Sequence, residues 1–308
     1  MTTHSLTDEQ LNMLFDEIPV LAGAPRRVEE LSGGLTNRNL KVSTPDGVFV
    51  VRCSDTNAEA LEIDRDIEFR NSVAAEEAGV GAPVLAYRPD LGILVIGFIE
   101  GSTLSRSDFG KPGVIERAAQ SCRRLHEGPR FVNDFNMFER QQGYWETVRR
   151  NGFKIPPRYL EQAPKIEKIR VALSATPGPT VPCNNDLLAE NFVDDGDKLW
   201  LIDYEYSGNN DPCFELGNLW CECRLDLDQL ELLVTSYFGR PSAAKLARAR
   251  LQGIVGQYGW TLWGAIQHAV SPLAFDFWEW SQERMDIALS HLNGPDLDRL
   301  IGDVLVSD

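Results

Sequence analysis

The sequence lacks the features that mark several common protein classes. Its six cysteines form no C-x-x-C pair and its four histidines are widely spread, so no zinc-binding pattern is present. We expect these cysteines to be small apolar residues in a reducing compartment. The longest apolar run, residues 91–99, is well short of the about 20 residues that span a membrane. The start of the chain also lacks the basic and apolar stretches of a secretion signal, so we expect a cytoplasmic protein without membrane insertion.

The chain also lacks an excess of basic residues. Lys and Arg number 30 against 46 Asp and Glu, which gives a net charge of −16. Such a chain repels phosphate backbones, so nucleic acid is not an expected partner, and the same field slightly favours a cationic small molecule. Hydrophobic residues make up 43% and charged residues 25%, as in globular proteins, which excludes intrinsic disorder. No feature of the sequence indicates an oligomeric state.

The chain divides into a β-rich first third and a helical remainder. After a short amphipathic helix expected over residues 7–15, β-type runs flank a Gly-rich stretch and a Pro-Asp-Gly turn, and residues 64–78 have helical spacing. Long helical patterns follow, with a short β-type passage at residues 191–202. We predict an α+β fold of two lobes. Residues 1–97 would form a small lobe with an antiparallel sheet and one main helix, and residues 98–308 a larger helical lobe.

The most informative stretch is PCNNDLLAENFVDDGDKLWLIDYEYSGNNDPCFELGN, residues 182–218. Four residues separate Asp186 from Asn191, and Asp203 ends the following strand-like run. Phosphoryl transfer needs one carboxylate to orient an acceptor hydroxyl and take its proton, and further oxygen ligands to hold magnesium. Taken alone, a D-x4-N pair is more often a pair of turn caps, because Asp and Asn favour turns. The surrounding residues decide between the two interpretations.

This stretch resembles the core of the choline/ethanolamine kinase family, within the wider group of aminoglycoside phosphotransferases and protein-kinase-like enzymes. The family pattern H-N-D-x4-N, followed by I-D-[FWY]-E-Y, is matched by N-N-D-x4-N and I-D-Y-E-Y, and the match continues through N-D-P and E-L-G-N. The resemblance implies a two-lobed protein-kinase-like fold, Asp186 as the catalytic base, and Asn191 and Asp203 as magnesium ligands. Two positions depart from the family: Asn184 replaces a histidine, and Glu215 replaces the more usual Asp.

The first lobe carries a matching set of nucleotide-binding positions. The loop LSGGLTN is similar to the family's G-G-x-[ST]-N loop, whose glycines let backbone amides approach phosphates. Arg52 stands where kinase-like folds place a basic residue on the phosphates, and Glu68 is its expected ion-pair partner, with Glu62 and Asp66 as alternatives. Residues 94–101 resemble the linker strand whose backbone binds adenine. The resemblance thus implies ATP binding by Gly33, Gly34, Thr36, Asn37, Arg52, Glu68, Phe98 and Ile99.

Aromatic side chains are dense in residues 260–284, which read WTLWGAIQHAVSPLAFDFWEWSQER. Aromatic residues at helical spacing usually belong to a core, but a quaternary ammonium group donates no strong hydrogen bond and is recognised by aromatic faces. Pro272 is expected to break the helix and fold two aromatic groups toward each other. The segment also resembles the acceptor site of choline kinases. That resemblance implies a substrate cage of Trp260, Trp263, Phe275 and Trp280, and Glu205 could offset the ligand's charge.

These observations predict an ATP- and Mg²⁺-dependent kinase that phosphorylates the hydroxyl of a small cationic alcohol, with choline favoured. Ethanolamine, a methylated ethanolamine, thiamine and an aminoglycoside are the alternative acceptors. Asn184 leaves open a second class, a non-catalytic amine-binding protein on a kinase-like scaffold. An interaction protein has little support, since the sequence has neither a charged tail nor a coiled-coil heptad pattern.

Overall fold

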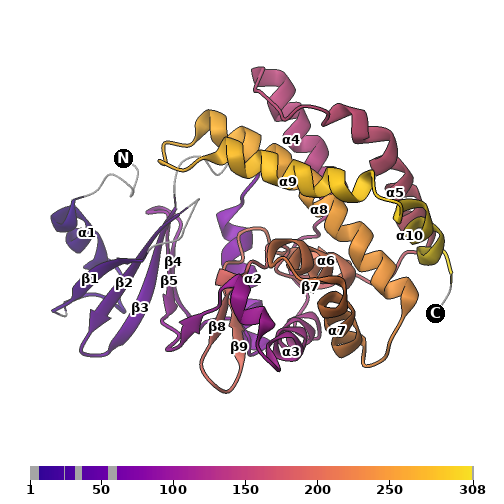
Figure 1. The fold of residues 1–308 in the computed structure, drawn as a ribbon. Helices are drawn as coiled ribbons and strands as arrows, with labels where there is room; N and C mark the ends of the chain where they lie inside the picture. The colour runs from indigo at the N-terminus through magenta and orange to yellow at the C-terminus, as the bar shows by residue number, and fades with distance from the viewer. Residues whose placement is uncertain (1–6, 24, 32–36, 55–60, 307–308) are drawn as a thin grey trace.

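The computed structural model describes residues 7–23, 25–31, 37–54 and 61–306 (Figure 1). The N-terminal part is a five-stranded antiparallel sheet in the order β1-β2-β3-β5-β4. Its strands are β1 (Arg27–Leu31), β2 (Asn37–Thr44), β3 (Gly47–Ser54), β4 (Val84–Arg88) and β5 (Ile93–Gly97). The Pro-Asp-Gly turn joins β2 to β3, where Thr44 pairs with Gly47.

Two helices accompany this sheet. α1 (Asp8–Phe15) begins after Thr7, which forms a capping box with Gln10. Its Phe15 is fully buried in one core with Val42 of β2, so α1 covers part of the sheet. α2 (Arg65–Glu77) lies between β3 and β4 in the chain and begins after Asp64, whose side chain accepts hydrogen bonds from two backbone amides. α2 matters for function because it carries the buried Glu68.

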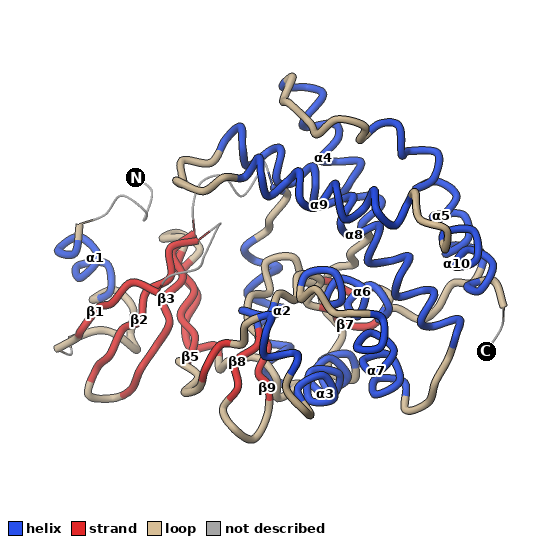
Figure 2. The backbone as a smooth tube through the Cα atoms, in the orientation of Figure 1, coloured by secondary structure: helices blue, strands red, loops and turns tan. Residues whose placement is uncertain are grey.

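The helical part is built around one long buried helix, α8 (Ala243–Val270), which packs against α4, α6, α9 and α10. The tube view in Figure 2 shows α9 running alongside α8. The α-helices after α2, apart from α8, are α3 (Val114–His126), α4 (Met137–Asn151), α5 (Ala163–Ala175), α6 (Pro212–Glu222), α7 (Leu227–Phe238), α9 (Phe277–Leu292) and α10 (Leu297–Val304). Short 3₁₀ turns occur at η3 (Arg106–Gly110), η4 (Leu160–Gln162) and η5 (Ala189–Asn191).

Five short strands in the helical part hold the loops that matter for chemistry. β7 (Val181–Cys183) pairs antiparallel with β10 (Gly208–Asn210), and β6 (Ser102–Thr103), β8 (Phe192–Asp194) and β9 (Leu199–Leu201) form a second small sheet. Residues 184–191, here called the catalytic loop, run from β7 to β8. Residues 202–207 run from β9 to β10. Because both strand pairs are antiparallel, these two loops come together at one edge.

The sheet and the helical part are joined by direct hydrogen bonds from α2 and the turn after it. The Leu201 amide donates to the Val80 carbonyl at 2.9 Å. The buried Asn71 side chain donates to Asn133 Oδ1 at 2.8 Å and to Ser207 Oγ at 3.0 Å. α2 is therefore anchored on the loop that follows β9, which fixes the position of its charged side chains against that loop.

The fold class predicted from the sequence is confirmed: a β-rich N-terminal part precedes a larger helical part. The leading helix, the main helix near residues 64–78 and the break at Pro272 are also present, since α8 ends at Val270 and α9 begins at Phe277. The division of the chain at residues 97 and 98 stays a prediction. Among the described helices, none is both long and apolar enough to cross a membrane.

One close backbone approach gives a test of this packing. A Cβ atom on Gly217 of α6 would overlap the Ala249 carbonyl oxygen of α8 and lie 2.6 Å from the Gly253 amide nitrogen. Because both obstacles are backbone atoms, we expect Gly217→Ala to lower the free energy of unfolding by about 3 kcal/mol. Gly302→Ala in α10 is the matched control, since a Cβ there meets no described atom within 4 Å, and it should stabilise by up to about 1 kcal/mol. Urea titrations of both variants would measure this, and equal midpoints would contradict the packing.

Candidate active site

A buried carboxylate on α6 binds the backbone of the catalytic loop. Glu215 is fully buried, and its two oxygens accept the backbone amides of Asn184 at 2.8 Å and Asn185 at 2.7 Å. Asn185 has a φ of 68°, a left-handed conformation that Asn tolerates better than most residues. His126 lies on the other side of Glu215, with Nε2 at 3.5 Å from Oε1 and Nδ1 at 2.7 Å from the Tyr237 hydroxyl. Glu215, in place of the family's usual Asp, thus fixes the loop backbone.

Asn184, which stands where the family has a histidine, ties the catalytic loop to the end of β9. Its side-chain nitrogen donates to the Asp203 carbonyl at 2.7 Å and to the Ile202 carbonyl at 3.2 Å. Its Oδ1 accepts the backbone amide of Asp186 at 3.1 Å. Asn184 therefore makes three hydrogen bonds that hold Asp186 and Asp203 in a fixed relation, which is the work of a scaffold residue.

Asp186, Asn191 and Asp203 come together at this edge. The Asn191 side-chain nitrogen donates to the Asp186 carbonyl at 2.8 Å, which leaves its Oδ1 as the atom that could bind a cation. The Ile202 amide donates to the Asn191 carbonyl at 3.0 Å, so Asp203 lies one residue beyond this pairing. Asp203 adopts a φ of 68°, which is uncommon for this residue type. A carboxylate and an amide oxygen are hard ligands of the kind that Mg²⁺ prefers, so this donor set fits magnesium.

The electrostatic setting of Asp186 is unusual. Burial raises the pKa of its carboxyl well above the ordinary value, and the nearby charges of Asp203, Glu222 and Glu205 raise it further, while Arg284 opposes them. The ionised form of Asp186 is therefore disfavoured in the free protein. A cation bound nearby would offset this repulsion.

Arg52 of β3 is the centre of a buried charge cluster, here called the arginine network, made up of Arg52, Arg65, Glu68, Asp203 and Glu205. The Arg52 guanidinium lies 3.1 Å from Glu68, 3.0 Å from Asp203 and 3.7 Å from Glu205. Glu68 is thus the helix carboxylate that pairs with Arg52. The alternatives lie elsewhere: Glu62 is near Arg140, and Asp66 accepts a hydrogen bond from Tyr87.

Glu205 lies within the arginine network. Its Oε2 accepts hydrogen bonds from Asn37 at 3.0 Å and from Arg65 at 3.2 Å. Burial and the charge of Asp203 raise the pKa of Glu205, and Arg65 and Arg52 oppose this. These contacts place the Glu205 carboxylate on the side of the sheet. Its geometry favours a role in holding Arg52 and Arg65 in position. Its predicted contact with the acceptor stays a prediction.

The remaining nucleotide-binding predictions are placed only in part. Gly33, Gly34 and Thr36 lie outside the described residues, while Asn37 begins β2 and is buried. Phe98 and Ile99 follow β5 and are half-buried. The Phe98 amide already donates to the Val48 carbonyl at 3.1 Å, so this residue would offer its carbonyl to a purine. A small cavity beside Arg52 is lined by Leu94, Ile96 and Asp203 among others, which places apolar β5 side chains next to the proposed phosphate site.

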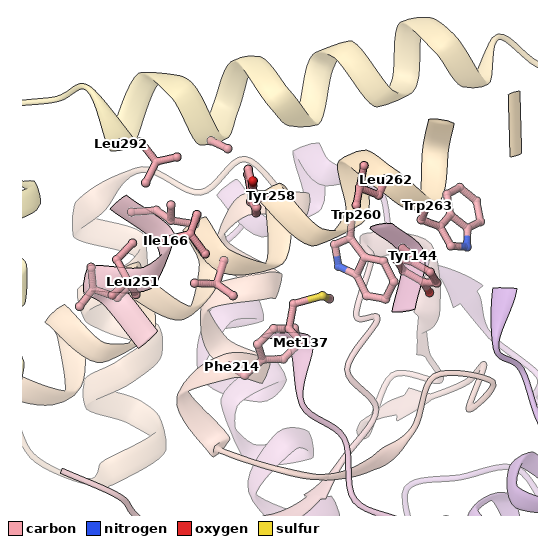
Figure 3. Packing of buried hydrophobic residues seen from close by; sticks show 14 of the residues in the cluster. Met137, Tyr144, Ile166, Phe214, Leu251, Tyr258, Trp260, Leu262, Trp263 and Leu292 are labelled. Atoms are coloured by element: carbon pink, nitrogen blue, oxygen red, sulfur yellow. The ribbon is translucent and has the colours of Figure 1, made fainter. Parts of the chain in front are cut away.

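Three of the four predicted cage residues gather in one place with Tyr206, and these four rings are called the aromatic cluster. The Trp263 ring centroid is 4.9 Å from that of Trp280, and the Trp260 centroid is 5.2 Å from that of Tyr206. The Trp263 indole donates to the Tyr206 hydroxyl at 2.6 Å. Trp260 and Trp263 project from α8 toward the side where Tyr144 lies (Figure 3). Phe275 is 43% exposed, and in the described ring contacts it reaches the cluster through Phe277.

Glu222 at the end of α6 is a site residue that the sequence did not single out. It is 4% exposed, and its oxygens accept hydrogen bonds from Gln257 at 2.7 Å and from Arg284 at 2.6 Å. The Arg284 guanidinium lies 3.5 Å from the centroid of the Trp280 ring. Glu222 is thus linked to the aromatic cluster through Arg284, and its charge also raises the pKa of Asp186. Tyr206, next to Glu205, was missed in the same way.

The fold and this arrangement of side chains define a kinase that acts on small molecules. The sequence profile described as choline/ethanolamine kinase matches residues 28–236. A choline/ethanolamine kinase family protein from Mesorhizobium loti is 31% identical, with 97% of this chain and 99% of that chain covered and a TM-score of 0.85. The choline kinase LicA from Streptococcus pneumoniae has the same fold, with 24% identity, coverage of 93% and 99%, and a TM-score of 0.79.

A probable ethanolamine kinase from Arabidopsis thaliana is also similar, at 25% identity over 81% of this chain and 75% of that protein. The chain therefore belongs to the choline/ethanolamine kinase family, as the motifs predicted. It is a phosphotransferase with an alcohol group as acceptor.

The raised pKa of Asp186 predicts that this residue lowers stability. Above the raised pKa the folded protein must ionise a half-buried carboxyl that lies near other carboxylates, whereas the unfolded chain ionises it freely near pH 4. We expect Asp186→Asn to raise the free energy of unfolding at pH 7 by about 1–2 kcal/mol and to abolish turnover. The gain should disappear below about pH 4, where both side chains are neutral. Asp286→Asn, at an exposed position of α9, is the control and should change little. Urea titration in magnesium-free buffer measures the effect, and an Asp186→Asn variant less stable than the wild type at pH 7 would contradict it.

Proposed function

We propose that this chain transfers the γ-phosphoryl group of ATP to the hydroxyl of choline, with Mg²⁺ as the metal ion. The observation that carries the proposal is the aromatic cluster. Its Tyr206 accepts at its carbonyl a hydrogen bond of 3.1 Å from Asn185 of the catalytic loop, and its Trp280 ring lies against Arg284, the partner of the buried Glu222. The family of the chain supports phosphoryl transfer, and the cluster supports the choice of acceptor. We expect the reaction to take place in the cytoplasm.

In this proposal, each part of the site has one task. Asp186 orients the acceptor hydroxyl and takes its proton, for which the carboxyl must be ionised, and a cation bound nearby would favour that form. Arg52, held by Glu68, provides a fixed positive charge on the nucleotide side. Asn191 and Asp203 would hold magnesium, which neutralises charge on the phosphates when bound. Catalysis then comes mainly from positioning and from charges that are already in place.

The state of Glu222 favours a quaternary over a primary ammonium group. Its Oε1 and Oε2 already accept hydrogen bonds from Gln257 and Arg284, and Arg284 balances its charge, so the carboxylate has few open acceptor sites. A primary ammonium needs acceptors for its N–H groups, whereas a quaternary ammonium is recognised by aromatic faces. Each aromatic face within about 6 Å of the cation contributes roughly 0.5–2 kcal/mol. This combination supports choline, and ethanolamine is the second candidate because similar proteins include ethanolamine kinases.

Two alternatives from the sequence, a different acceptor and a non-catalytic binding protein, are less well supported. Family membership leaves thiamine and aminoglycosides less supported as acceptors than an amino alcohol. A non-catalytic binding protein was suggested by Asn184, but that side chain makes three hydrogen bonds that position the loop. Because Asn184 still holds the catalytic loop and Asp186, Asn191 and Asp203 are all present, an active enzyme is better supported.

The acceptor preference can be tested by ADP release with ATP and Mg²⁺ over choline, ethanolamine, thiamine and kanamycin. We expect the highest kcat/KM with choline. Trp263→Leu should raise the KM for choline about tenfold, because one desolvated aromatic face contributes about 1.4 kcal/mol, within the upper part of the range of roughly 0.5–2 kcal/mol, while kcat changes less.

Trp278→Leu is the matched control. Trp278 is half-buried on α9, and its ring contacts are with Lys154 and His268, away from the aromatic cluster. It should leave the KM for choline within about twofold. A turnover preference for ethanolamine, or equal effects of the two Trp variants, would retain the kinase and reject the cage.

A further inference from the structure

Leu61 and Glu62, which precede the first helical residue of α2 by four and three positions, are hydrogen-bonded to Arg140 and Tyr144 of α4. Arg140 Nη1 donates to the Leu61 carbonyl at 3.3 Å and to the Glu62 carbonyl at 3.1 Å, and lies 3.6 Å from the Glu62 carboxylate. The Tyr144 hydroxyl, one turn along α4, also donates to the Leu61 carbonyl at 3.4 Å. Leu61 is 2% exposed and packs in the core of the helical part.

The backbone at this contact is constrained. Glu62 has a φ of 55°, a left-handed conformation that side chains with a Cβ adopt at a cost of roughly 1–3 kcal/mol. Such a conformation persists where the surroundings impose it. Here Arg140 imposes it, because it donates hydrogen bonds to the carbonyl before Glu62 and to the carbonyl of Glu62 itself. The Arg140 side chain is 17% exposed, so these bonds are largely shielded from water.

The same guanidinium lies on the rings of the acceptor side. Its central carbon is 5.2 Å from the Phe135 ring centroid and 5.7 Å from that of Tyr206. Tyr206 belongs to the aromatic cluster and accepts the indole N–H of Trp263. Phe135 lies 6.5 Å from Trp260 between ring centroids. A shift of the Arg140 side chain would therefore change its contact with Tyr206, which belongs to the proposed cage.

Arg140 thus bonds to both substrate sides of the site. Toward the sheet, residues 61–62 lead into α2 through its cap, Asp64, and the first turns of α2 carry Arg65 and Glu68 of the arginine network. Toward α8, the ring faces of Phe135 and Tyr206 lead to the two tryptophans. The path between the proposed nucleotide and acceptor sites is short and consists of packed or hydrogen-bonded groups.

We infer that Arg140 is a positioning residue that couples acceptor binding to nucleotide binding. When choline fixes the rings under Arg140, the arginine holds the start of α2, and with it Glu68 and Arg52, in the arrangement that receives ATP. The coupling is reciprocal, because two ligands that favour one arrangement strengthen each other by the same factor. This inference rests on the proposed function for the identity of the acceptor.

The coupling is measured as a ratio of two dissociation constants. Calorimetric titration with choline, without and with a saturating Mg²⁺ complex of a non-hydrolysable ATP analogue, should show about fivefold or tighter binding with the nucleotide in the wild-type protein. In Arg140→Gln the ratio should fall below about twofold. A merely structural arginine would weaken both titrations and leave their ratio unchanged.

Two further variants complete the test. Arg150→Gln, on the same helix but exposed, should keep the wild-type ratio. If Arg140→Gln does not fold, Arg140→Lys keeps the charge but loses the planar donor group, and its ratio should lie between the other two. A wild-type ratio of one, or a wild-type ratio retained in the folded Arg140 variant, overturns the inference.

A readout that needs no acceptor separates this inference from the proposed function. Amide hydrogen exchange over residues 61–68 should be faster in Arg140→Gln than in Arg150→Gln, because the contact holding this segment is lost. Unchanged exchange would overturn the inference. If wild-type protein binds ethanolamine and not choline, the proposed acceptor is wrong, and the same coupling ratio is then measured with ethanolamine.

Discussion

A buried guanidinium is the constraint on which the active site depends. Arg52 is 7% exposed, and burial alone would lower its pKa, but Asp203, Glu68 and Glu205 raise it, so the group stays charged. A charge in that position must be paired, because an unpaired buried ion is strongly destabilising. Its partners come from α2 and from the loop after β9, so pairing Arg52 brings the sheet, its helix and the edge that carries Asp203 into one arrangement.

The surrounding residues show what this arrangement demands. Asn185 and Asp203 take left-handed backbone conformations, and Asp186 is held where its ionised form is disfavoured. Glu215 and Asn184 offset these demands with hydrogen bonds to the loop backbone. The backbone of the catalytic loop and of the residues after β9 is thus held by hydrogen bonds within the protein itself. Such preorganisation is what a reaction based on positioning and electrostatics requires.

The sequence predicted the parts of the site whose residues are close together along the chain. Asp186 and Asn191 share one short loop, so their spacing was informative, and Asp203 followed a recognisable strand. Glu222, Tyr206 and Arg140 were not predicted as site residues, because their contacts join helices and loops that are far apart in sequence. The fold class followed from the change from β-type to helical patterns. The side on which Glu205 lies, and the exposure of Phe275, depended on packing that no spacing reveals.

The selection of a quaternary ammonium alcohol by an aromatic cluster beside a phosphoryl-transfer base is the property that most needs measurement. It is tested most directly by ³¹P NMR of one reaction that contains the protein, ATP, Mg²⁺ and equal amounts of choline and ethanolamine. We expect the γ-phosphate signal of ATP to be lost while phosphocholine forms as the main phosphomonoester. Phosphoethanolamine as the main product, or inorganic phosphate alone, would contradict it.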